Sequence, residues 1–133
     1  MRHIFSALLC LTLFAVSCKK TNPDFVIPDG TYVGTFQRVT TVGGQLSNVT
    51  ITFSVNNWTG QSEFAKYPAL CHGTYKVSGG DDVTFENACP WTAEFDWTLI
   101  LSQDYKFKIV GDSLEISRSY NGSFKDIYKL KKQ

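Results

Sequence analysis

Apolar and polar residues alternate along much of the chain, at the period of a strand with one buried face. In the clearest example, segment 49–55, apolar side chains occupy every second position: Val49, Ile51, Phe53 and Val55. Threonine and serine fill the positions between them. The pattern predicts a strand whose first set of side chains is buried and whose second set faces solvent.

Similar runs predict further strands at 31–39, 58–64, 73–77, 83–86, 95–102, 105–109, 114–117 and 124–130. Glycine, asparagine and aspartate between the runs are typical of tight turns. Gly34, inside the first run, indicates a bend or a close approach of another backbone. The sequence Cys89-Pro90-Trp91 interrupts the pattern, because proline has no N–H to donate to a neighbouring strand.

Eight or nine short strands with short connections predict an all-β, antiparallel up-and-down meander over residues 29–133. Closure into an eight-stranded barrel would remove both exposed sheet edges. A β-sandwich is the alternative, but it needs longer crossing connections. We expect large side chains to fill the barrel: Phe36 or Val33, Phe53, Trp58, Phe85, Trp97, Phe107 and Tyr128.

The chain begins with an apolar run that ends at Cys18 and is too short to span a bilayer. It has the form of a signal peptide, residues 1–17. The sequence Ala15-Val16-Ser17-Cys18 resembles the lipobox of bacterial lipoproteins, with alanine where leucine is usual. The resemblance implies that Cys18 is acylated and becomes the first mature residue. Residues 18–28 would then be a flexible tether, and an ordinary secretory peptide is the alternative.

Length and net charge limit the number of domains and the classes of binding partner that we expect. Removal of residues 1–17 leaves 116 residues, enough for one domain. The chain has 13 Lys and Arg against 12 Asp and Glu, and Arg2 is removed with the signal peptide, so the mature charge is zero. Nucleic-acid binding needs a basic face, so we do not expect a nucleic-acid partner. We expect a monomer.

Two cysteines remain after Cys18, and in an oxidising compartment they predict a disulfide between Cys71 and Cys89. A reactive pair or a metal site is the alternative, but neither a second histidine nor CxxC spacing accompanies them. His72 follows Cys71, yet neighbouring strand residues point to opposite faces, which disfavours a Cys–His dyad.

Glu94 and Asp96 would share one strand face, an arrangement that is far more often a solvated surface than a paired-carboxylate site. We therefore predict no catalytic residue, no metal, no cofactor and no enzymatic activity.

Several phrases resemble the strands and turns of lipocalin-like domains in small bacterial lipoproteins, many of them from Bacteroidota: 30–36, 73–79, 110–116 and 128–130. The resemblance spans most of the mature chain. It implies a calycin-type barrel outside the cytoplasm and brings no activity with it.

A Cys71–Cys89 bridge would gather apolar residues at one end of the barrel. The candidate binding residues are Tyr67, Leu70, Trp91, Trp97 and Trp58. We predict a binding module anchored by lipid to the outer membrane of the cell envelope, on its periplasmic face or at the cell surface. Its ligand would be a small apolar molecule or a protein partner. Trp91 acting only as a plug of the barrel end is the alternative.

A second hypothesis is an envelope protein inhibitor. Its loop 87–93, which begins at Asn87 and ends at Ala93, would insert Trp91 into a target enzyme. An open barrel interior would favour a small-molecule ligand. A filled interior with an exposed Trp91 would favour a protein partner.

Overall fold

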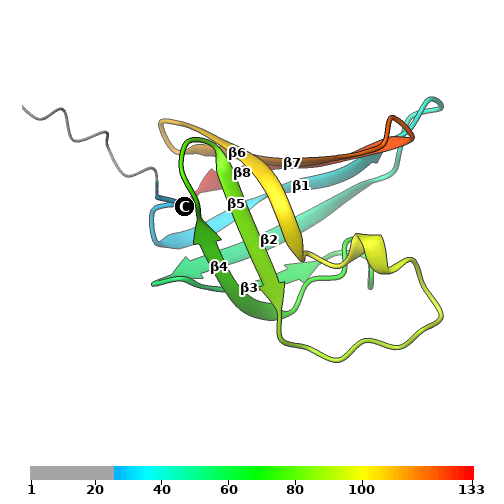
Figure 1. Cartoon of the computed structure of the whole chain (residues 1–133), viewed down its shortest axis with the longest axis horizontal. Helices are drawn as coiled ribbons and strands as arrows, with labels where there is room; N and C mark the ends of the chain where they lie inside the picture. Colours follow the sequence, from blue (N-terminus) through cyan, green and yellow to red (C-terminus); the bar gives the residue numbers. More distant parts are fainter. Residues whose placement is uncertain (1–25) are drawn as a thin grey trace, which may run out of the picture.

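Eight strands run through residues 26–133, the part of the chain that the computed structural model describes. They are β1 (Gly30–Val39), β2 (Leu46–Ser54), β3 (Asn57–Ser62), β4 (His72–Val77), β5 (Asp82–Asn87), β6 (Gln103–Val110), β7 (Ser113–Tyr120) and β8 (Phe124–Lys132). Each strand pairs antiparallel with the next, and β8 pairs with β1, so the sheet closes into a barrel (Figure 1). The predicted up-and-down barrel is confirmed, with eight strands.

The predictions for the amino-terminal segment fall mostly beyond this range. The signal peptide 1–17, the lipidation site Cys18 and the tether as far as residue 25 lie outside the described residues. The last tether residues belong to the folded structure, because Ile27 is buried in the core. The Tyr75 hydroxyl donates to the Ile27 carbonyl at 3.4 Å, and the Tyr32 hydroxyl donates to the Pro28 carbonyl at 2.8 Å.

In strand β2 the alternating sequence pattern corresponds to side chains that face the barrel interior and side chains that face solvent. Its buried residues are Ser47, Val49, Ile51 and Phe53, which alternate with more exposed neighbours. The prediction that Val55 continues this buried set is wrong. The strand ends at Ser54, and Val55 lies in a turn with a φ of 43° and 72% of its surface exposed.

Gly34 lies where β1 and β8 approach each other closely. A Cβ atom at this position would stand 1.9 Å from the carbonyl oxygen of Lys129. The close backbone approach predicted for this glycine is therefore confirmed.

Aromatic rings occupy the barrel interior. The ring centroids of Phe36 and Tyr128 are 4.8 Å apart, and those of Phe53 and Tyr75 are 5.1 Å apart in an edge-to-face arrangement. The buried interior also includes Tyr32, Trp58, Phe85, Tyr105 and Phe107. Of the two alternatives for β1, Phe36 faces inward, while Val33 is exposed.

Segment 95–102 is not the predicted strand. It forms a loop with one 3-10 turn, η1 (Trp97–Leu99), and Trp97 is 55% exposed instead of buried in the barrel. The Asp96 side chain caps this turn, because it accepts hydrogen bonds from the Thr98 amide at 2.9 Å and the Thr98 hydroxyl at 2.6 Å. Among residues 26–133, no helix has the length and apolarity needed to cross a bilayer.

Candidate functional site

The two longest connections of the barrel, residues 63–71 and 88–102, lie at the same end. We call this end, with the shorter connections 40–45 and 121–123, the disulfide end. The opposite end carries the connections 55–56, 78–81 and 111–112. Figure 1 shows the segment 88–102 reaching away from the strands, so this segment can form a surface of its own.

A disulfide joins the two long connections. Cys71 and Cys89 are bonded, as the sequence predicted, with their Cα atoms 6.3 Å apart. Backbone hydrogen bonds add a second junction, from the Ala69 amide to the Leu99 carbonyl at 2.9 Å and from the Leu101 amide to the Ala69 carbonyl at 3.3 Å. Ala69 and Leu101 are fully buried there. The long loop is therefore held at two places.

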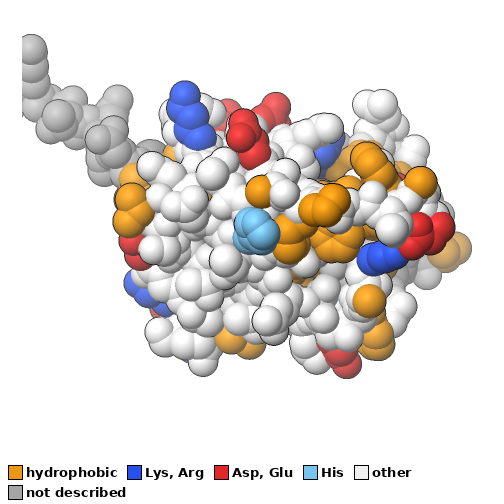
Figure 2. Space-filling model, turned by 90° about the horizontal axis from the view of Figure 1, so that it is seen from below, with side chains coloured by type: hydrophobic (Ala, Val, Ile, Leu, Met, Phe, Trp, Pro, Cys, Tyr) orange, Lys and Arg blue, Asp and Glu red, His pale blue; other side chains and the backbone are white. Residues whose placement is uncertain are grey.

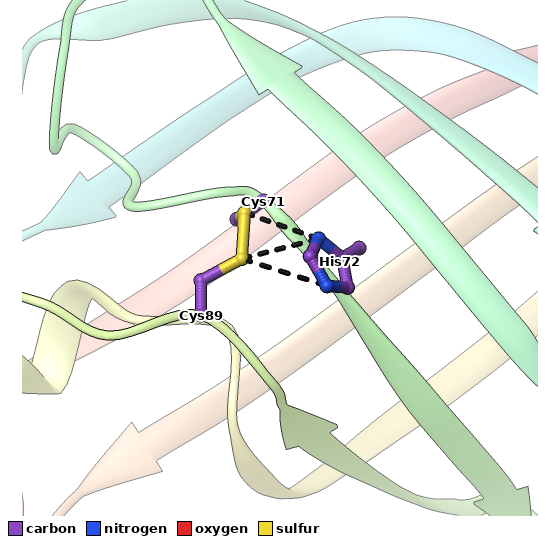
Figure 3. Close-up of side chains that lie close together, drawn as sticks. All are labelled: Cys71, His72 and Cys89. Carbon is purple, nitrogen blue, oxygen red and sulfur yellow. Dashed lines mark hydrogen bonds between the residues drawn. A yellow bond between two sulfur atoms is a disulfide. The ribbon is translucent and has the colours of Figure 1, made fainter.

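His72 lies against this disulfide (Figure 3). Its Nδ1 atom is 3.3 Å from the Cys71 sulfur and 3.2 Å from the Cys89 sulfur. The expectation that Cys71 and His72 point apart is therefore wrong. Strand β4 begins at His72, so Cys71 precedes the strand and the alternation of strand side chains does not apply to it. The three residues form a group of possible metal ligands whose donor atoms lie within 4.8 Å of one another.

Replacing Cys71 and Cys89 together by serine is expected to lower the free energy of unfolding by about 3 kcal/mol. The bridge closes a loop across a sequence separation of 18, and its removal returns conformational entropy to the unfolded chain. Urea unfolding followed by circular dichroism measures the change. Wild type reduced with a phosphine should show the same loss. A double variant as stable as the wild type would mean that the remaining contacts already hold both loops.

A charged cluster anchors the long loop to the barrel wall. Arg38 makes a bidentate ion pair with Asp126, with both N···O distances at 2.7 Å, and donates to Asp96 in the loop at 2.7 Å. The Arg38 guanidinium also lies 4.2 Å from the centre of the Phe124 ring. Asp126 is only 1% exposed, so Arg38 supplies the charge that a buried carboxylate requires.

The carboxylates of the loop are paired separately. Glu94 forms an ion pair with Lys66, and the hydrogen bonds from Lys66 and then Thr92 lower the pKa of Glu94 to about 2. At Asp96, burial raises the pKa, but hydrogen bonds from Thr98 and the charge of Arg38 outweigh it, and the net shift is downward. The prediction that Glu94 and Asp96 share a strand face is wrong, because this segment is a loop. Each carboxylate acts as an anchor of the loop.

Tyr67 fastens the shorter of the two connections. Its hydroxyl donates to the Gln45 carbonyl at 3.0 Å, and its ring meets Phe36 edge to face at 5.2 Å. The Ser62 hydroxyl also donates to the Pro68 carbonyl at 2.6 Å. Tyr67 therefore joins the loops of the disulfide end to the core.

A cleft of about 580 Å³ opens between the long loop and the barrel wall. It is lined by Asn87, Cys89, Pro90, Trp91, Trp97, Thr98, Ile100, Ser102, Gln103 and Arg118. Trp91 is half-buried with its ring 5.7 Å from that of Phe95, and Trp97 donates from Nε1 to the Thr92 carbonyl at 2.9 Å. Figure 2 shows apolar side chains gathered beside the histidine on this side of the molecule.

Two polar atoms of the cleft residues have no hydrogen-bond partner. They are the Nε1 donor of Trp91 and the Oδ1 acceptor of Asn87, and both atoms are buried. An unpaired buried polar atom costs folding free energy. Arg118 closes one wall, where it donates to Gln103 Oε1 at 2.7 Å and stacks 4.6 Å from the centre of the Tyr120 ring.

The structure brings together two of the five candidate binding residues. Trp91 and Trp97 line the cleft, and Tyr67 lies at the same end. Leu70 is buried against the core, and Trp58 is 1% exposed inside the barrel, where its Nε1 donates to the Glu86 carbonyl at 3.2 Å. Only a ligand inside the barrel would touch Trp58.

The charged cluster was not predicted from the sequence. Arg38 and Asp126 are register partners on β1 and β8, and both lie at inward-facing positions of their strands. The sequence contained an indication of this pair. Arg38 lies two residues after the buried Phe36, and Asp126 lies two residues before the buried Tyr128, so each charge shares the face of a buried aromatic residue. Two opposite charges on the buried faces of the first and last strands, which a closed barrel brings together, indicate a pair.

Comparison with known proteins gives no match to a family model, to a curated protein or to a solved structure.

Proposed function

We propose that the protein is a non-catalytic binding module of the cell envelope and that its ligand occupies the Trp91–Trp97 cleft. The observation that carries the proposal is an open cleft of about 580 Å³ at the disulfide end, lined by Trp91 and Trp97 and by polar residues that include Gln103 and Arg118. A concave, mostly apolar site with a few placed polar groups is the usual form of a binding pocket.

The filled interior of the barrel favours a ligand site outside the barrel. Aromatic side chains occupy the space in which a lipocalin-like barrel would hold a small molecule. The cleft, in contrast, is braced by a disulfide and by ion pairs on the loop that forms it. Braced aromatic residues lose little conformational freedom on binding, which favours affinity.

The ligand class that fits the cleft best is a segment of another envelope protein. Trp97 and Pro90, both exposed, offer apolar contact to its side chains.

The setting of this module is part of the same proposal. The chain would be a lipocalin-like lipoprotein of a bacterium, of the kind found in Bacteroidota. It would be attached to the outer membrane through acylated Cys18, with residues 18–28 between the lipid and the barrel.

Replacing Trp97 by alanine is expected to reduce capture of the partner from native envelope at least about tenfold, since truncation of an aromatic hot-spot residue costs about 2 kcal/mol or more. The measurement is a pull-down with the full-length protein, followed by mass spectrometry and by titration of the purified partner. Val110→Ala is the matched control, because Val110 is also an exposed apolar residue and lies near the opposite end.

Equal capture by the wild type and by Trp97→Ala would contradict the proposed site. A small molecule retained by both proteins would favour the barrel interior instead. Loss of enzymatic activity in a captured partner would support the inhibitor hypothesis, in which the loop 87–93 is the contact.

A further inference from the structure

The side chains of Cys71, His72 and Cys89 are arranged as three corners of a metal site. In a tetrahedral zinc site with ordinary bond lengths, a nitrogen and a sulfur ligand stand about 3.5 Å apart. The His72 Nδ1 atom already lies 3.3 Å and 3.2 Å from the two sulfurs (Figure 3). In the oxidised protein the sulfurs are bonded to each other and are not thiolates, so they are not available as ligands.

We propose that reduction of the Cys71–Cys89 disulfide converts these two cysteines and His72 into a binding site for a thiophilic ion of the Zn²⁺ type. A dithiol reductant supplies two electrons and two protons and is itself oxidised to a disulfide, which leaves two thiols on the protein. Each thiol releases its proton when its sulfur binds the ion.

The backbone that carries the three ligands is held without the S–S bond. The Gly60 amide donates to the Cys71 carbonyl at 2.7 Å, and the Ala88 amide donates to the His72 carbonyl at 2.9 Å. The Asn87 side-chain amide donates to the Cys89 carbonyl at 2.7 Å. Reduction therefore frees the sulfurs while their main-chain positions stay fixed.

Only a small movement separates the oxidised from the metal-binding arrangement. Two sulfurs on one tetrahedral ion stand about 3.8 Å apart, so the sulfurs must move apart once their bond is broken. Rotation about the Cα–Cβ bonds of two half-buried side chains supplies this movement.

The chemistry of the donors selects the class of ion. Two thiolates and one imidazole favour Zn²⁺ or a similar thiophilic ion over Mg²⁺ or Ca²⁺, which prefer oxygen ligands. Three protein ligands leave the fourth position for water, and the exposure of His72 gives solvent access to it.

The test uses Co²⁺ as a spectroscopic substitute for Zn²⁺. The full-length chain carries Cys10→Ser and Cys18→Ser, so that Cys71 and Cys89 are its remaining cysteines. The protein is reduced with a phosphine, which takes up an oxygen from water to become the phosphine oxide, and is desalted without oxygen. We expect one Co²⁺ per chain, with thiolate charge-transfer and tetrahedral absorption bands that Zn²⁺ abolishes. The oxidised protein should show neither band.

His72→Ala in the same background is expected to weaken Co²⁺ binding at least about tenfold, because one ligand is lost. Thr59→Ala is the matched control, since Thr59 is the register partner of His72 on β3, and this variant should bind as the parent does. Circular dichroism checks that each reduced protein keeps its β structure.

Three results would overturn the proposal. The first is a folded, reduced parent protein that binds no Co²⁺ when one Co²⁺ is added per chain. The second is equal Co²⁺ binding by the parent and by His72→Ala. The third is loss of the barrel on reduction. None of these results depends on whether the cleft binds a protein segment.

Discussion

Replacing Arg38 by alanine is expected to lower the free energy of unfolding by about 3–5 kcal/mol, the usual cost of removing one partner from a buried ion pair. Asp126, which is 1% exposed in the wild type, would lose both of its hydrogen bonds from Arg38. The loop carboxylate of Asp96 would lose its partner as well. Urea unfolding, followed by tryptophan fluorescence, measures the loss.

The double variant Arg38→Met with Asp126→Leu separates the ion pair from the packing. Replacing both charges by apolar side chains of similar size removes the buried unpaired carboxylate, so most of the lost stability should return. Lys106→Ala is the control, since Lys106 pairs with Asp81 and Asp82 on an exposed surface, and its unfolding midpoint should stay unchanged. A mild effect of Arg38→Ala, equal to that of Lys106→Ala, would show that Asp126 finds another way to be neutralised.

Replacing Trp58 by alanine is expected to cost about 3–5 kcal/mol of stability, because a fully buried indole is removed and the surrounding rings cannot fill the space. Trp58 packs edge to face with Phe85, with the centroids 6.2 Å apart, and its indole hydrogen bond to Glu86 would also be lost. Denaturant unfolding followed by circular dichroism measures the effect.

Trp97→Ala provides the comparison with an exposed indole. Its side chain is 55% exposed and makes one hydrogen bond, so the loss should stay below about 1 kcal/mol. Trp58→Phe should fall between the two, because it keeps most of the apolar volume. Similar losses for Trp58→Ala and Trp97→Ala would contradict the division into one core tryptophan and one surface tryptophan.

This division separates the fold from the proposed function. Residues such as Phe36, Phe53 and Trp58 stabilise the barrel and are inaccessible to a partner. Trp91 and Trp97 come from a loop that contributes no strand to the barrel. Substitutions in the cleft can therefore change binding while the barrel remains folded, which makes the capture experiment interpretable.

The candidate site was predictable in part. The cysteine count, together with the expectation that the chain is exported, was enough to predict the Cys71–Cys89 bridge, and with it the end of the barrel where aromatic residues gather. The exposure of Trp97 was not predictable from alternation, because the Asp96 cap and the contact of Asp96 with Arg38 fold that segment as a loop. The contact between His72 and the disulfide was also not predicted. Cys71 lies one residue before β4 begins, so the alternation of strand side chains does not apply to it.

By itself the sequence determined the all-β class, the meander order and the inward side of most strands, as in β2. Alternation and turn residues act between near neighbours, so they can be read along the chain. Only the tertiary structure decided that Arg38 meets Asp126 and that His72 lies on the disulfide. These contacts join residues that are distant in sequence or lie outside regular strands, where no local periodicity specifies the partner.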